Sequence, residues 1–168
     1  MKTKTITTIL LLAAVAAFSS CAKEELDNEK PVIVLTAPEE DEAVLPGSDI
    51  HFEVTLSDNE ALASYKVNIH GAFDGHTHSA TTRATEDSVA FEKTWMESDF
   101  IALGEEPIAQ KRSVTIHHHL IEIPETVNGK PLKEGHYHFI IYCTDQAGQE
   151  SFIAREIEIS YEAEEHQH

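Results

Sequence analysis

Much of the chain alternates apolar and polar residues with a period of two, which is typical of half-buried β-strands. The clearest cases are residues 50–56, 63–69 and 137–143, in which every second side chain is apolar. Runs at residues 31–35, 89–95, 113–123 and 152–161 predict further strands, and Gly, Pro, Asn and Asp mark turns between them. One short helical turn could lie within residues 96–110. The pattern predicts an all-β, immunoglobulin-like sandwich of about seven strands, with a His-rich insertion after the third strand.

The first twenty residues follow a different pattern. Lys2 and Lys4 precede an unbroken apolar run at residues 9–18, which is too short to cross a bilayer core of about 30 Å as a helix. The run predicts a signal peptide over residues 1–20. Next come two serines and Cys21, and this segment resembles the lipobox of bacterial lipoproteins, although Phe18 replaces the usual Leu. The resemblance implies that Cys21 becomes the first mature residue and carries the acyl chains.

An acidic stretch without periodicity follows, and we interpret residues 21–30 as a tether, 31–161 as the folded domain and 162–168 as a tail. Lys23-Glu24-Glu25 resembles the short signal that sends lipoproteins of Bacteroidota to the outer face of the outer membrane. Simple solubility explains these charges equally well. We therefore expect a lipid anchor in the outer membrane, with the domain facing the cell surface or, alternatively, the periplasm. Cys143 lies in an alternating run and is expected to be a small buried residue.

Composition narrows the ligand classes. The chain has 30 acidic and 12 basic residues and a formal net charge of −18, so electrostatic attraction to nucleic acid or anionic lipid is not expected. Cations are favoured instead. Eleven histidines are present, an unusually large number, and neutral imidazole is the commonest metal ligand.

Two of these histidines meet if the strands pair as in an immunoglobulin-like sandwich. The end of the strand at residues 63–69 then lies beside the start of the strand at 137–143, and His70 and His138 share one outer face. The loop that leaves His70 turns at glycines and carries His76 and His78, which project to one side in extended backbone. We predict that these four histidines bind one metal ion, with His119 as a fifth or alternative ligand.

The other histidines are interpreted more simply. His117-His118-His119 lies where the apolar positions change from even to odd, which suggests a bulge. His51 alternates with core residues and is assigned to plain surface. His166 and His168 belong to the acidic tail.

Several of these motifs occur together in one known family. The spacing His70-x-x-Phe73-Asp74-x-His76-x-His78, and Gly135-x-Tyr137-His138-Phe139 followed by Asp145-x-x-Gly148, resemble immunoglobulin-like lipoproteins of Bacteroidota that are classed only as a domain of unknown function. The resemblance covers roughly residues 30–160. It implies the fold and the lipid anchor, but no activity.

Function is therefore inferred from the residues. We expect a lipoprotein that binds Zn²⁺ or Cu²⁺ for capture, buffering or delivery, because imidazole suits these ions. Its partner would be an outer-membrane transporter or another surface protein. The alternative is a surface module that binds glycan or protein with incidental histidines, for which Tyr142 and Trp95 are candidate exposed aromatics. An enzyme is not expected, since no catalytic triad or carboxylate pair is evident.

Overall fold

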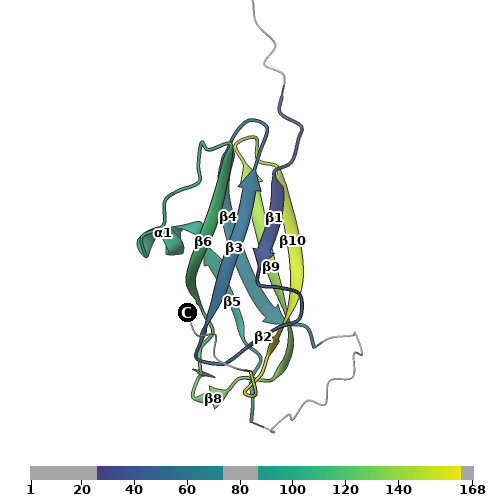
Figure 1. Ribbon diagram of the computed structural model, residues 1–168, viewed down its shortest axis with the longest axis vertical. Coiled ribbons are helices and arrows are strands. Elements are labelled where there is room, and N and C mark those ends of the chain that lie inside the picture. The colour runs from purple at the N-terminus through teal and green to yellow at the C-terminus, as the bar shows by residue number, and fades with distance from the viewer. Residues whose placement is uncertain (1–25, 74–86, 164–168) are drawn as a thin grey trace, which may run out of the picture.

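A computed structural model describes residues 26–73 and 87–163. Two β-sheets pack face to face, and the apolar core lies between them (Figure 1). In the described ranges, no helix has the length and apolar character needed to cross a bilayer. The elements in chain order are β1 (Val32–Ala37), β2 (Glu42–Val44), β3 (Asp49–Ser57), β4 (Leu62–Gly71), β5 (Glu92–Met96), α1 (Glu97–Ala102), β6 (Ser113–Glu122), β7 (Thr126–Val127), β8 (Lys130–Pro131), β9 (Gly135–Asp145) and β10 (Glu150–Ile159).

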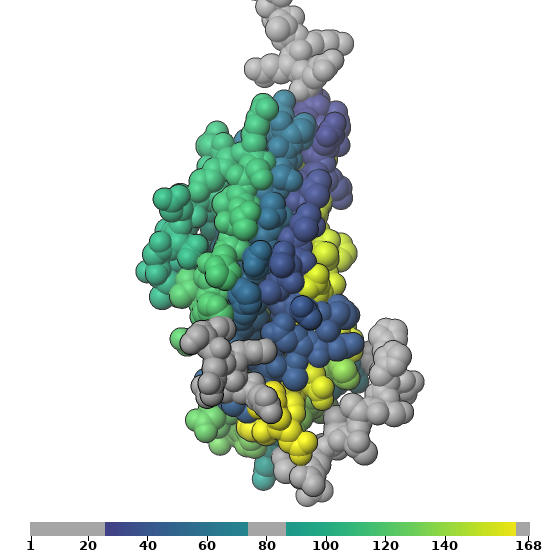
Figure 2. All heavy atoms as spheres, in the orientation of Figure 1, coloured from purple at the N-terminus to yellow at the C-terminus, as the bar shows by residue number. Residues whose placement is uncertain are grey.

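The sheet topology is that of an immunoglobulin-like sandwich. One sheet has the order β1-β3-β6, and the other has the order β2-β10-β9-β4-β5. The three-stranded sheet faces the viewer in Figure 2, where β6, β3 and β1 form green, blue and purple bands. The N-terminal segment contributes β1 to one sheet and β2, parallel to β10, to the other. The strand β2 is not among the seven runs predicted from sequence, and neither are the short strands β7 and β8, which form a separate two-stranded sheet.

The core is built from the alternating positions of the long strands. Phe52 and Leu56 of β3 and Phe139 of β9 are completely buried, as the period-two pattern predicts. Burying such a side chain typically contributes about 1.5–3 kcal/mol. Cys143 is buried as well, and burial raises its pKa to about 12. Its thiol therefore stays protonated and serves as an apolar filler.

Tyr137 joins the start of β9 to the preceding loop. Its hydroxyl donates to the carbonyl of Lys133 at 2.6 Å and accepts from the backbone N–H of Phe91 at 3.3 Å. A tyrosine bonded back to the upstream backbone at this place is a recurrent feature of immunoglobulin-like sandwiches. These hydrogen bonds hold the loop before β9 in place. They therefore help to position the start of β9, which carries His136 and His138.

The predicted short helix is α1, whose Phe100 is fully buried in the core against Tyr65. Glu97 accepts the backbone N–H of Ile108 at 2.8 Å, which holds the following loop against the helix. Trp95 precedes the helix and is only 3% exposed. It is therefore a core residue, and the interpretation of Trp95 as an exposed aromatic is wrong. The predicted His-rich insertion falls between β4 and β5, mostly in residues 74–86, outside the described residues.

Candidate metal centre

Three histidines gather on the outer face of the three-stranded sheet. His51 lies on β3 between the buried Ile50 and Phe52, so its side chain points outward. His117 and His119 lie on the neighbouring strand β6. Because strands β3 and β6 are hydrogen-bonded neighbours, the three imidazoles approach one another. One ligand nitrogen from each lies within 4.8 Å of the other two.

A β-bulge produces this arrangement. Phe52 pairs with His118, but Ile50 pairs with Ile121, so β6 has one extra residue opposite His51. The bulge predicted from the change of parity is therefore confirmed. It turns the apolar side of β6 from even to odd positions and leaves His119 outside, beside His51, where the two rings stack with centroids 5.0 Å apart.

The distances between the imidazole nitrogens are close to those expected when the nitrogens bind one metal ion. The Nε2 atoms of His51 and His117 lie 2.9 Å apart, within hydrogen-bonding distance. Two nitrogens bound to one tetrahedral zinc, each at about 2.0–2.1 Å, would lie roughly 3.3 Å apart. A small rotation of the exposed His117 ring would separate them that far. The three nitrogens would then leave a coordination position open, as in zinc sites that bind water or an exchangeable ligand.

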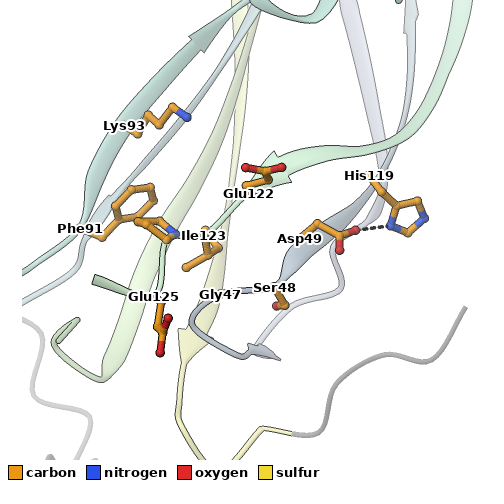
Figure 3. Close-up of a pocket in the computed structure, with 10 residues that line it drawn as sticks. Gly47, Ser48, Asp49, Phe91, Lys93, His119, Glu122, Ile123 and Glu125 are labelled. Carbon is orange, nitrogen blue, oxygen red and sulfur yellow. Dashed lines mark hydrogen bonds and ion pairs between the residues drawn. The ribbon is translucent and has the colours of Figure 1, made fainter. Parts of the chain in front are cut away.

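Carboxylates support the histidines from one side. Asp49 Oδ2 lies 2.8 Å from Nδ1 of His119 (Figure 3), so a metal would take the Nε2 atom of this ring. A carboxylate bound to the second ring nitrogen orients metal-ligating histidines and raises their basicity. Glu122 pairs with Asp49 across the strands, and both line a groove with His119 (Figure 3). The negative charge of these two carboxylates therefore favours binding of a cation beside them.

His118 faces the opposite way and is not part of the cluster. It is 6% exposed and packs against Phe52 and Phe100, with ring centroids 4.9 and 4.7 Å away. Burial lowers its pKa to about 4. The backbone N–H of Leu120 donates to its Nδ1 at 3.3 Å, which places the proton of the neutral ring on Nε2. His118 is thus a neutral core residue.

The predicted pair His70 and His138 does form, on the outer face of the other sheet. The two residues are directly paired across β4 and β9, and Nε2 of His70 lies 3.4 Å from Nδ1 of His138. Asn68 Oδ1 lies 2.5 Å from Nδ1 of His70. Register places Glu156 beside His138 and Glu92 beside His70, so the two rings lie in a row flanked by carboxylates.

A third imidazole extends this second cluster. His136 lies two residues before His138 on β9, and its Nδ1 is 2.9 Å from Oε1 of Glu156. His136, Glu156 and Asp41 each offer a ligand atom within 4.8 Å of the others. This face therefore also has a mixed nitrogen and oxygen group that could hold a metal.

The sequence-predicted site is divided by the structure. His70 and His138 are brought together, whereas His119 lies on the opposite sheet with His51 and His117. His76 and His78 lie outside the described residues. Sequence reasoning missed His51 and His117 as partners, although a signal was present. His70 and His138 were paired because outward side chains on neighbouring strands approach one another. The same argument applies to the strands predicted at residues 50–56 and 113–123, which are neighbours in this topology.

The fold and the two clusters define an immunoglobulin-like all-β domain with histidine groups on both outer faces that could hold a metal. A family model matches residues 19–160, and the chain belongs to that family, described as a domain of unknown function (DUF4625). No curated protein was found to match the sequence. The match confirms the resemblance to a domain of unknown function and supplies no activity, so function is argued from the residues.

Proposed function

We propose that this protein binds a transition-metal ion, Zn²⁺ or Cu²⁺, through its outward histidines, with His51, His117 and His119 as the principal site. The observation that carries the proposal is the convergence of these three imidazoles within 4.8 Å. Imidazole nitrogens select zinc, copper and nickel over magnesium and calcium. The pair His70 and His138 is a second site on the other sheet, and His76 and His78, which follow His70 in the sequence, are its further expected ligands.

The sequence supports a role in capture, buffering or delivery rather than in catalysis. Cys21 follows a lipobox-like segment, and lipidation there would hold the domain at the outer membrane. The strongly acidic chain would attract cations before contact, and salt would screen this attraction. An outer-membrane transporter or another surface protein would be the recipient of a delivered ion.

Calorimetric titration of the mature, metal-stripped protein with Zn²⁺ and Cu²⁺ tests the proposal. We expect His117→Ala to weaken binding at least tenfold, because a three-nitrogen site loses one ligand. His166→Ala, in the acidic tail, is the control and should leave affinity unchanged. His138→Ala should remove only the second binding event. Protons compete for imidazole nitrogen, so both events should weaken in acid. Equal affinity in the parent, His117→Ala and His166→Ala proteins would refute metal binding at this site.

A second function is favoured by one observation on the five-stranded sheet. Phe152 is 68% exposed and packs against Tyr142, with ring centroids 5.8 Å apart, while the ammonium of Lys66 lies 4.4 Å from the centre of the Tyr142 ring. Exposed aromatic pairs of this kind suit sugar rings or an apolar protein surface. Binding of the protein to a glycan array tests this alternative. Loss of that binding in Phe152→Ala, with metal affinity unchanged, would support it.

A further inference from the structure

We propose that Asp27, Asp58 and Asp145 form a calcium site at the end of the sandwich where β1 begins. The three residues come from separate segments: the stretch before β1, the β3–β4 turn and the end of β9. One carboxylate oxygen from each lies within 4.8 Å of the other two. The histidine triad is near the other end of the molecule, since β3 starts beside it and ends at Ser57 (Figure 1).

Buried oxygens without partners indicate that this cluster suits a cation. Asp145 is 2% exposed, and its Oδ1 accepts the backbone N–H of Gln149 at 2.8 Å, but its Oδ2 is buried with no hydrogen-bond partner. Asp58 repeats the pattern. Its Oδ1 accepts the N–H groups of Glu60 and Ala61 at 2.9 and 2.8 Å, while its Oδ2 is also buried without a partner. A buried carboxylate oxygen normally has a hydrogen bond or a counter-ion.

No basic side chain compensates these charges in the part of the chain that the structure describes. The ion pairs found there involve other residues, and none includes the three aspartates. Three carboxylates this close repel one another strongly in a desolvated setting. A divalent cation between the three carboxylates would remove this repulsion.

The donor set selects calcium. All three side chains offer only oxygen, and Ca²⁺ takes six to eight oxygen ligands in irregular geometry at about 2.3–2.6 Å, with water completing the shell. Mg²⁺ requires near-ideal octahedral geometry and keeps most of its water, so a cluster of three carboxylates in which two oxygens are buried suits it less. Zinc and copper prefer the imidazoles at the other end. The two sites are therefore chemically distinct and can be tested separately.

Calcium at this place would attach the segment before β1 to the body of the domain. Asn59 donates to Oδ1 of Asp27 at 3.0 Å, and the side chain of Gln149 donates to the carbonyls of Asp27 and Glu29 at 3.2 and 3.0 Å. These contacts already bring the segment against the two turns. A bound ion would add the strongest link, so the direction in which the chain leaves the domain would depend on calcium.

The test is calorimetric titration of the mature, EDTA-treated protein with Ca²⁺, together with thermal unfolding. We expect one site with Kd of about 10⁻⁴–10⁻³ M, the range of extracellular calcium modules. Calcium at ten times Kd should raise Tm by about 3–6 °C. Asp27→Asn should weaken binding at least tenfold. Glu60→Gln is the control, because Glu60 is an exposed acidic residue of the β3–β4 turn that lies outside the cluster. This variant should bind Ca²⁺ as the parent does.

Asp145→Asn gives a test with the opposite sign. Without calcium it should unfold at the same temperature as the parent or higher, because one repelling charge is removed, and calcium should no longer raise Tm. If this variant fails to fold, Asp27→Asn decides the question alone. Absence of calcium binding in the parent, equal affinity of Asp27→Asn and Glu60→Gln, or Mg²⁺ affinity as high as that for Ca²⁺ would overturn the proposal. His117→Ala should leave the calcium response intact, which separates this site from the histidine centre.

Discussion

Arg155 connects the two sheets at the edge where β1 ends. Its guanidinium projects from β10 and donates to the backbone carbonyls of Leu35 at 2.6 Å, Thr36 at 3.3 Å and Pro38. The ladder between β1 and β3 is irregular at this point, because the register shifts between Leu35 and Ala37. Arg155 thus supplies donors to carbonyls at the place where the neighbouring strand pairs imperfectly.

Arg155→Met removes these donors and keeps most of the aliphatic stem. A hydrogen bond to a charged group contributes about 1.5–3 kcal/mol, but water can reach part of this half-buried site and replace some of the loss. We therefore expect the free energy of unfolding to fall by about 2–4 kcal/mol in total. For a domain of this size that corresponds to a decrease in Tm of about 6–12 °C.

Urea unfolding of the mature protein measures the effect, with the fluorescence of the single, buried Trp95 as the probe. The matched control is Arg112→Met, because Arg112 makes one exposed hydrogen bond, from Nε to the carbonyl of Glu60 at 3.2 Å. The control should lose less than about 1 kcal/mol. The slope of free energy against urea should stay the same in all three proteins. A loss in Arg155→Met no greater than in Arg112→Met would refute the role of Arg155.

Two further predictions concern the anchor and the core. Cys21→Ser should release the protein from membranes in fractionation experiments, because acylation of this thiol is the expected anchor; a processed chain that still sediments with membranes would contradict it. His118 should make the fold acid-sensitive. Its pKa is about 4 when folded and about 6.5 when unfolded, so the unfolded state binds the proton first and stability falls as pH drops from about 6.5 to 4. In EDTA, His118→Leu should show a smaller decrease in Tm between pH 7.5 and 4.5 than the parent; equal decreases would count against this assignment.

The fold was predictable because its signal is local. Side chains alternate along each long strand, so Phe52, Phe139 and their equivalents identify both the strand and its buried face from sequence alone. The strand β2 was not predictable on this basis. It has three residues and a parallel partner, β10, that is more than a hundred residues away in the chain. Such a strand depends on its neighbour and has almost no pattern of its own.

The candidate sites were predictable only where strand pairing was inferred together with the alternation. That combination correctly placed His70 opposite His138. It was not applied to His51, whose isolated position on a strand suggests plain surface until β6 is placed beside it. The calcium candidate had no signal at all, because Asp27, Asp58 and Asp145 lie in unrelated segments, and only tertiary structure shows that Asp58 and Asp145 each have one buried carboxylate oxygen without a partner.

The direction of β1 has a mechanical consequence. The chain enters at one end of the sandwich and β1 runs lengthwise from there, antiparallel to β3 (Figure 1). A pull on the residues before β1, directed away from the domain, therefore acts along the strand. It loads the β1–β3 hydrogen bonds in shear, so that they must break together, rather than peeling them apart one at a time. A domain held by its N-terminal segment in flowing liquid would resist such a force better than one whose first strand lay across the direction of pull.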